Sequence, residues 1–355
     1  MIKATINLKV MNRNIRKLRE TLLPKVLVCA VVKADAYSFG DAAIAREIEP
    51  EVDCFAVAHI LEAIRLRRAN IKKPILLLGV CGDYETAVHL GVIVSINSIA
   101  EMKSLCKVMR KLDGGAKCKI HIKVNTGMNR YGISNVWQLR GILAVAAENP
   151  EVVVDGLYTH LAFEADNTNE IDAQLRKFAP FRSVMRTHFP RAIIHAASSG
   201  SASYLSAQFD MVRVGKLIYG GLDGYRTAVK VTSRISAVQT LAAGAHVGYG
   251  GTVTAAAPTI CGIVPCGYAD LANINFANRH SVLVDGIPCK VLGRVCMDSF
   301  MIDVTDIKSP LGKTVTIIAD QRGLGIMDIC HTCDIIACDL LCGLNFSRAE
   351  VVYRK

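Results

Sequence analysis

Between Val26 and Val214 the chain alternates short apolar runs with amphipathic stretches, and the alternation repeats eight times. The runs are short and rich in β-branched residues, which is typical of strands buried on both faces. Eight such strand–helix units in about 200 residues fit a (β/α)8 barrel. A doubly wound sheet would carry a glycine-rich phosphate turn after its first strand, and Lys33–Tyr37 is not one. The predicted strands are Val26–Val32, Cys54–Ala58, Pro74–Leu78, Val92–Ile96, Cys118–Val124, Val152–His160, Ala192–Ala197 and Met211–Val214.

The helical patterning stops after Tyr225, and strand-like segments take over. We therefore predict an α/β chain with a (β/α)8 barrel domain at residues 1–225 and a mostly β C-terminal domain at residues 226–355. One helix is expected in the second domain, near Met327–Leu341. The predicted strands there are Val229–Leu241, Val247–Val253, Thr259–Cys266, Ser281–Val284, Cys289–Val304 and Thr314–Ile318. The helices expected in the first domain are Asn12–Leu23, Ile60–Ala69, Ile99–Leu112, Trp137–Glu148 and Ile171–His188.

Charge and composition argue against several classes of function. The 355-residue chain has a formal charge of +11, but its basic residues fall on helical faces without aromatic interleaving, so we expect no nucleic-acid partner. No apolar run reaches the length of a membrane span and no signal peptide is apparent, which predicts a cytoplasmic location. The basic surface would also suit the cytosolic domain of a membrane-anchored protein. Cys330 and Cys333 flank His331, but no second ligand pair follows, and we expect no metal.

Chemically active residues follow the barrel strands at their C-terminal ends, where barrel enzymes place their active sites. Lys33 ends the first strand, and a lysine set over a protein interior suits covalent chemistry with a carbonyl cofactor such as pyridoxal phosphate (PLP). Small hydroxyl and glycine residues late in the barrel let backbone N–H groups approach a phosphate. The other residues on this rim are Asn125, Arg130, His160, Ser198–Gly200 and Arg213–Gly215.

Five motifs occur in a recognisable order. They are Val-Val-Lys-Ala-Asp-Ala-Tyr at 31–37, Asn-Thr-Gly-Met-Asn-Arg at 125–130, Met-Val-Arg-Val-Gly at 211–215, Gly-Tyr-Gly-Gly-Thr at 248–252 and Cys-Met-Asp at 296–298. Together they resemble the PLP-dependent alanine racemases over nearly the whole chain. The resemblance implies that the chain interconverts L- and D-alanine to supply D-amino acid for cell-wall precursors. It also implies a homodimer in which each subunit completes the active site of the other.

The resemblance assigns roles residue by residue. Lys33 and Tyr249, from different subunits, would be the acid/base catalysts on opposite faces of the substrate. Arg213 would donate to the pyridine nitrogen of PLP with His160 supporting it. The remaining cofactor contacts would come from Tyr37, Ser199, Gly215, Lys216 and Phe346. The amino-acid substrate would meet Arg130, Met297, Asp298, Tyr268 and Asn345. Lys123 matches a lysine that is carbamylated in some members of the family.

Departures from the family keep alternatives open. Asn125 stands where many members have aspartate, and Phe346 stands where a tyrosine is common. The neighbouring Asn345 is similar to the polar residue of vancomycin-resistance serine racemases, which makes a serine or dual alanine/serine racemase the alternative function. The small PLP-binding proteins without turnover lack the β domain and any counterpart of Tyr249. PLP decarboxylases with a similar barrel would need a cysteine and aspartate pair in the second domain.

Overall fold

A computed structural model describes residues 2–112 and 115–355, which form two compact units. The barrel unit contains residues 15–36 and 40–215, and the sheet unit contains residues 2–14, 37–39 and 216–355. The N-terminal segment therefore belongs to the sheet unit, because its strand pairs there. The sequence had assigned these first residues to the barrel domain.

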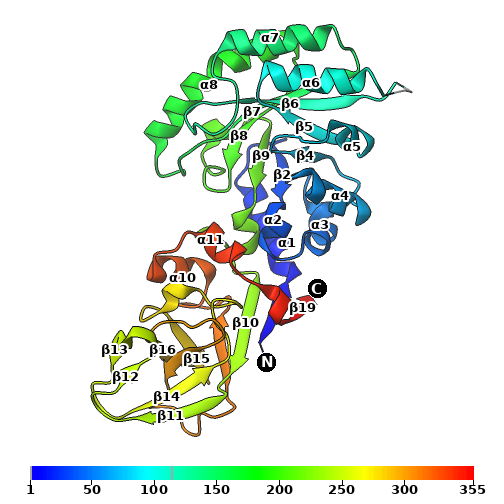
Figure 1. Ribbon diagram of the computed structural model, residues 1–355. Helices are drawn as coiled ribbons and strands as arrows, with labels where there is room; N and C mark the ends of the chain where they lie inside the picture. The colour runs from blue at the N-terminus through cyan, green and yellow to red at the C-terminus, as the bar shows by residue number, and fades with distance from the viewer. Residues whose placement is uncertain (1, 113–114) are drawn as a thin grey trace. The chain divides into compact units, whose positions relative to one another are not determined.

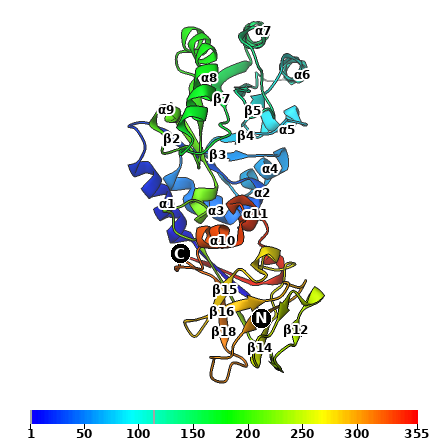
Figure 2. The ribbon, with the colours of Figure 1, turned by 90° about the vertical axis from the view of Figure 1, so that its left-hand side faces the viewer.

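The barrel unit is a closed parallel barrel of eight strands, each buried along most of its length; the strands are labelled in Figures 1 and 2. This confirms the predicted fold class. Three strands have the predicted bounds and the other five differ at their ends by one or two residues. In chain order the strands are β2 (Leu27–Val31), β3 (Cys54–Val57), β4 (Ile75–Leu77), β5 (Val92–Ile96), β6 (Cys118–Val124), β7 (Val152–Thr159), β8 (Ile193–Ser198) and β9 (Met211–Val214).

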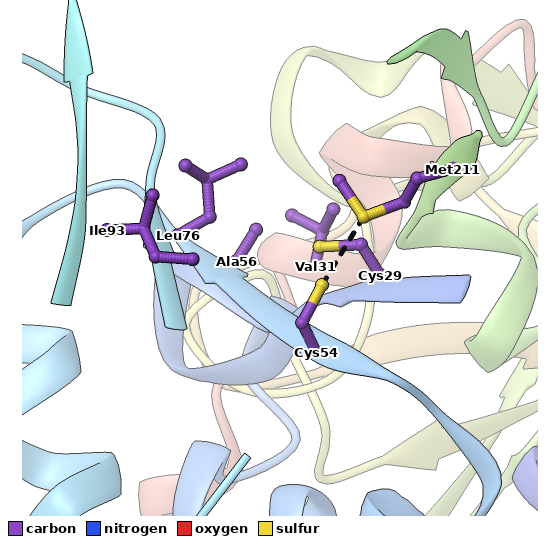
Figure 3. Close-up of a cluster of buried hydrophobic side chains, with 7 residues drawn as sticks. All are labelled: Cys29, Val31, Cys54, Ala56, Leu76, Ile93 and Met211. Atoms are coloured by element: carbon purple, nitrogen blue, oxygen red, sulfur yellow. Dashed lines mark hydrogen bonds between the residues drawn. The ribbon is translucent and has the colours of Figure 1, made fainter. Parts of the chain in front are cut away.

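The interior of this barrel has an apolar half and a polar half. Strands β2 to β5 and the start of β9 contribute a buried apolar cluster in which Cys54 Sγ lies 3.5 Å from Met211 Sδ (Figure 3). The cluster consists of Cys29, Val31, Cys54, Ala56, Leu76, Ile93 and Met211. The later strands contribute buried polar side chains instead, namely His121, Tyr158, His195 and Arg213. A barrel core is usually filled by branched aliphatic residues, so the polar half has a purpose other than filling space.

Helices follow the strands, and side-chain caps fix where several of them begin. Ser98 caps α6 by accepting the N–H of Glu101, and Asn135 caps α7 by accepting the N–H of Gln138. Such caps satisfy N–H groups that a helix leaves unbonded in its first turn. The helices of this unit are α2 (Lys33–Tyr37), α3 (Asp41–Ile48), η1 (Glu49–Glu51), α4 (Ile60–Arg68), α5 (Tyr84–His89), α6 (Ile99–Met109), α7 (Val136–Ala147), α8 (Thr168–His188) and α9 (Leu205–Gln208); α1 (Leu8–Glu20) links it to the sheet unit.

The sheet unit is built on nine strands in the order β11-β14-β17-β16-β15-β18-β10-β1-β19, with a separate β12-β13 hairpin. Helices α10 and α11 lie beside each other at its C-terminal end (Figures 1 and 2). The strands are β1 (Lys3–Asn7), β10 (Val229–Arg234), β11 (Ala237–Leu241), β12 (His246–Val247), β13 (Val253–Thr254), β14 (Thr259–Val264), β15 (Ser281–Val284), β16 (Ile287–Leu292), β17 (Phe300–Asp303), β18 (Thr314–Ile318) and β19 (Glu350–Arg354). Its helices are η2 (Lys216–Tyr219), η3 (Tyr249–Gly251), η4 (Ile274–Phe276), α10 (Ile326–Cys333), α11 (Ala337–Cys342) and η5 (Phe346–Arg348).

Several predicted segments are divided in the structure. The single helix expected at Met327–Leu341 is two helices, because Asp334 adopts a left-handed conformation that ends α10. The run Cys289–Val304 is two strands joined by a loop, since Gly293 turns the backbone with a φ of +68°. Among the described residues no single helix is long and apolar enough to span a membrane, although α10 and the segment after it pass by length and composition as a pair bent by 115°.

Candidate active site

The C-terminal ends of the barrel strands gather the residues that the sequence predicted for this rim. Lys33 follows β2, Arg130 follows β6, His160 follows β7, Ser199 follows β8, and Arg213 lies within β9. The structure thereby brings five of the predicted side chains to one end of the barrel unit. No group of three or more His, Cys, Asp or Glu side chains in residues 2–112 and 115–355 is arranged to hold a metal ion.

The backbone after Lys33 turns in a left-handed helical conformation. Ala34, Asp35 and Ala36 all have φ of 53°, although none of them is glycine. Non-glycine residues pay roughly 1 to 2 kcal/mol each for this conformation, so the surrounding structure must hold the turn in place. The Glu62 carboxylate does so by accepting the Ala34 N–H at 2.7 Å, and Asp35 accepts the Asp41 N–H at 2.8 Å. Strain held in this way is typical of functional positions.

Arg213 is buried and its guanidinium is fixed by four contacts. It donates to His195 Nδ1 at 2.6 Å, to the carbonyl oxygens of Thr159 at 2.8 Å and Ala196 at 3.0 Å, and meets His160 Nδ1 at 3.2 Å. All four contacts use the Nη atoms, so within residues 2–112 and 115–355 the Nε–H has no acceptor and is left for another group. Because an arginine cannot give up its proton, it offers a fixed donor to such an acceptor.

The rim carries a strong positive potential. Burial, together with the positive charges of Arg213, Arg130, Lys123 and Lys33, lowers the pKa of His160 to about 3, so this imidazole is neutral at physiological pH. Among the described residues, no hydrogen bond involves the Lys33 amine. A cationic rim with donors and few carboxylates has the chemistry that binds an anion.

Lys123 on β6 is a buried lysine surrounded by cations. Burial and then the charges of Arg130, Arg213 and Lys33 lower its pKa to about 8. Its amine lies 5.2 Å from the centre of the Tyr131 ring and 5.4 Å from that of Tyr158. These aromatic faces stabilise a cation weakly in place of a carboxylate.

The loops after β8 and β9 are tied to each other. Ser199 Oγ is buried and accepts the Gly215 N–H at 2.9 Å. A hydroxyl that accepts one hydrogen bond can still donate its own proton. This pair therefore presents a donor at the position where the sequence predicted phosphate binding.

In the sheet unit Tyr249 projects from a glycine-rich turn and is 70% exposed. Gly248 and Gly250 on either side have φ of +67° and +73°, a conformation that side chains disfavour. An added Cβ at Gly248 would also lie 2.7 Å from Met301. The turn therefore depends on glycine, and it directs the phenol outward from its own unit.

Two loops of the sheet unit approach each other around Gly267. Tyr268 and Ala269 donate their N–H groups to the carbonyl oxygens of Cys296 and Met297, both at 3.0 Å. A Cβ on Gly267 would lie only 2.0 Å from the Met297 oxygen, so glycine is required there. The Met297 N–H itself makes no hydrogen bond within the described residues. It is thus a donor left for an outside acceptor.

The C-terminal segment carries the remaining predicted residues of the sheet unit. Asn345 donates to the Ala269 carbonyl at 2.9 Å and accepts from the Ser347 hydroxyl at 2.7 Å, so its amide is engaged locally. Asp298 accepts from Arg348 at 2.9 Å. Phe346 packs edge-on against Phe39, with ring centroids 5.4 Å apart.

Two predicted phosphate ligands also fall in the sheet unit. The Tyr37 ring lies 5.1 Å from the Tyr219 ring, and its burial raises the pKa of the phenol well above the ordinary value, so it is a hydrogen-bond donor. Lys216 begins η2.

Sequence reasoning missed Glu62 and His195, which hold the Lys33 turn and Arg213. Each is a single polar residue in an otherwise apolar surrounding, and such residues are often ordinary core groups. Only the spatial pairing of His195 with Arg213 identifies it, although a histidine inside a predicted buried strand was a usable signal.

Comparison with known proteins agrees with this arrangement. Residues 6–223 match the family model for the alanine racemase N-terminal domain, and residues 228–353 match that for the C-terminal domain. An alanine racemase of Streptococcus pyogenes is 33% identical over 96% of this chain and 95% of its own length. One from Sorangium cellulosum is 34% identical over 90% of this chain and 89% of its own length.

Solved structures agree as well. The structure of alanine racemase from D-cycloserine-producing Streptomyces lavendulae matches with a TM-score of 0.92 and 27% identity over 100% of this chain and 97% of that one. With the family models matching both parts of the sequence and the same fold throughout, the chain belongs to the alanine racemase family and is an amino-acid racemase.

Proposed function

We propose that this racemase interconverts L- and D-alanine with PLP bound at the barrel rim. The observation that carries the proposal is the Arg213 guanidinium, which is buried, fixed through its Nη atoms and has an Nε–H that no described residue accepts. The pyridine nitrogen of PLP is such an acceptor. The cationic rim and the Ser199 hydroxyl fit its phosphate.

PLP, when bound, supplies an electron-withdrawing ring that makes the α-proton of the amino acid acidic. Lys33 Nζ would hold the cofactor and move a proton at one face of the substrate, and the Tyr249 hydroxyl would do so at the other. Arg213 would leave the pyridine nitrogen unprotonated, because its own proton is not transferable. The free Met297 N–H would receive the substrate carboxylate, with Asp298 next in the chain and Tyr268 held close by its hydrogen bond to the Cys296 carbonyl.

We further propose a homodimer with shared active sites. Tyr249 is 70% and Met297 55% exposed in the single chain, which is unusual for groups that must act in a closed site. A second copy would cover them and complete the site at its own Lys33. The remaining predicted contacts of cofactor and substrate, at Tyr37, Gly215, Lys216, Phe346 and Arg130, belong to this proposal.

Lys123 is proposed to carry a carbamate. A neutral amine attacks CO2 at carbon and loses one proton, which converts a buried cation into an anion among Arg130, Arg213 and Lys33. The pKa of about 8 leaves a useful neutral fraction near physiological pH. Carbon-13 NMR of protein equilibrated with labelled CO2 should give one carbamate resonance that Lys123→Met removes and Lys119→Met retains.

The test of the proposed function is racemisation itself. Protein reconstituted with PLP is incubated with a panel of L-amino acids, and the products are separated by chiral chromatography. We expect D-alanine as the main product, with Lys33→Ala inactive. Turnover of a different amino acid ahead of alanine would refute the substrate assignment. The serine alternative gains no support from the side-chain hydrogen bonds of Asn345, which all go to Ala269 and Ser347 of the protein itself.

A further inference from the structure

The buried charge of Arg213 has no carboxylate beside it. Its four partners are two imidazoles and two carbonyl oxygens, and no described aspartate or glutamate forms an ion pair with it. A buried cation is costly unless an opposite charge or several dipoles compensate it. The groups that compensate the charge of Arg213 lie in the polar half of the barrel interior.

The His195 imidazole leads from Arg213 to a second histidine and then to an acid. His195 Nε2 lies 2.8 Å from His121 Nδ1, and His121 Nε2 lies 3.6 Å from an oxygen of Asp155. His121 Nε2 has no hydrogen bond within the described residues, so Asp155 is the acceptor it faces. The result is a continuous series, Arg213–His195–His121–Asp155, across the barrel from β9 to β7.

The direction of this series follows from arginine chemistry. Arg213 can only donate, so His195 Nδ1 must accept and its Nε2 must carry the proton. The Nδ1 of His121 then accepts, and its Nε2–H points toward the carboxylate. Burial lowers the pKa of both imidazoles, with the charge of Arg213 contributing, so both are neutral donors and acceptors. The positive charge of Arg213 at one end of the series is therefore connected to the negative charge of Asp155 at the other end through the aligned dipoles of the two imidazoles.

Local features of the barrel support this arrangement. The register of β6 with β7 shifts between Ile120 and His121, which leaves Asp155 as the extra residue of a bulge. Bulges commonly redirect a side chain. Next to it, a Cβ on Gly156 would lie 2.7 Å from the His121 ring, so glycine makes room for the imidazole. The Tyr158 ring stacks on His195 at 4.7 Å and 5°.

We propose that Asp155 is a positioning residue that orients the Arg213 guanidinium through His121 and His195. Asp155 lies in the N-terminal half of β7, away from the strand end that bears the rim residues. No proton moves along the series; the carboxylate polarises both imidazoles and strengthens the hydrogen bond that His195 accepts from Arg213. The inference rests on the proposed function only for the use of Arg213 by PLP.

A purely local role for Asp155 is the competing explanation. Its other oxygen pairs with the exposed Lys119 amine at 3.1 Å. Lys119→Met removes that ion pair and leaves the imidazole series intact. Asp53→Asn is a matched control just before β3, because Asp53 also pairs with a basic side chain, the partly exposed Arg19, at 2.9 Å.

The first test uses cofactor-free protein labelled with nitrogen-15 in histidine and arginine. Wild type, Lys119→Met and Asp53→Asn should show both buried imidazoles protonated at Nε2 with the same His195 Nδ1 shift. Asp155→Asn keeps the shape of the side chain but lacks the charge, and should move the His195 Nδ1 and Arg213 resonances toward unbonded values, with Asp155→Glu restoring them. Unchanged His195 and Arg213 resonances in folded Asp155→Asn would overturn the proposal, whether or not the protein racemises alanine.

The second test uses the PLP-loaded enzyme. Asp155→Asn should lower kcat about tenfold with little change in KM, as outer partners of a ligating histidine do in metal sites. The absorption maximum of the bound cofactor should shift with it, because the donor to the pyridine nitrogen has moved. If the PLP-loaded wild type does not racemise alanine, the proposed function is refuted. The NMR test then still decides whether Asp155 orients Arg213.

Discussion

The buried carboxylate of Glu62 accepts the backbone N–H of Ala34 at 2.7 Å, one residue beyond Lys33. The same carboxylate accepts the N–H groups of Ala58 at 2.7 Å and His59 at 3.1 Å, where it caps α4. One side chain thus joins the loops that follow two adjacent barrel strands. It compensates for the strained turn that holds Lys33.

Glu62→Ala should destabilise the protein by about 2 to 4 kcal/mol, because three partly buried N–H groups lose a charged acceptor. It should also weaken PLP binding, since the turn after Lys33 loses its restraint. Gln138→Ala is the matched control, because Gln138 closes a similar capping box on α7. Chemical denaturation and cofactor titration measure the two effects. PLP affinity equal in the two variants would contradict the role of Glu62.

Gly267→Ala should disrupt the loop that presents Met297. The added Cβ would lie 2.0 Å from the Met297 oxygen, and the displacement should cost about 3 kcal/mol. We expect KM for the amino acid to rise more than kcat falls, because the affected N–H binds a carboxylate in the proposed site. Gly82→Ala is the control, since nothing lies within 4 Å of its added Cβ. Steady-state kinetics of both variants tests this prediction, which fails if KM in Gly267→Ala is the same as in Gly82→Ala.

Lys33→Ala and Tyr249→Phe should each abolish most racemisation for different reasons. In a shared-site dimer, mixing the two inactive proteins should restore part of the activity, because about one site in each hybrid dimer regains both catalysts. Two copies of the same mutant, exchanged in the same way, serve as the control. Hybrids that form, as shown by mass spectrometry of tagged subunits, and yet stay inactive would exclude the shared site.

Acid should destabilise the cofactor-free protein through its buried histidines. Burial lowers the folded pKa of His121, His160, His195 and His280 below 6.5, and that of His160 to about 3. Below pH 6.5 the unfolded chain therefore binds protons that the folded chain does not, so stability falls as the pH is lowered; His160 alone contributes about 1.4 kcal/mol per pH unit between about pH 6 and pH 4. Urea unfolding at pH 7 and pH 5 should show this loss, and His160→Gln should reduce it. An equal loss of stability between pH 7 and pH 5 in the wild type and in His160→Gln would contradict the lowered pKa of His160.

Asn345→Ala distinguishes a substrate contact from a structural cap. In the sequence-based alternative, Asn345 forms a hydrogen bond with the hydroxyl of a serine substrate. In that case Asn345→Ala should lower serine turnover far more than alanine turnover. Because the amide is bonded to Ala269 and Ser347, we expect similar losses on both substrates. Ser347→Ala removes one of these partners and serves as the comparison. A selective loss of serine turnover would restore the sequence-based prediction.

Most of the barrel could be predicted from the sequence, because its strands are continuous runs of buried apolar residues. Strands β5, β6 and β9 begin and end where the patterns predicted. The left-handed turn after Lys33 could not be predicted, since it includes Ala34 and Ala36, which disfavour this conformation, and tertiary contacts impose it. Strand β1 was missed because its five residues pair only with segments more than 200 residues away.

The site was predictable for residues at or near the C-terminal ends of strands and unpredictable for residues deeper in the barrel. Arg213 and His160 were identified by position on the rim. His195 and Asp155 gain meaning only from neighbours on other strands, because parallel pairing brings together residues far apart in the chain.

Strand β1 lies between β10 and β19, so the first and last strands of the chain are direct neighbours in one sheet. During synthesis the barrel segment is complete once residue 215 has been made, whereas β1 must wait for residues 350–354 to leave the ribosome. The barrel can therefore form early, and the sheet unit can be finished only after residue 354 has left the ribosome. A ribosome stalled before residue 350 has been made would hold a folded barrel and an unfinished sheet, a state that a chaperone should recognise by the unpaired edge of β1.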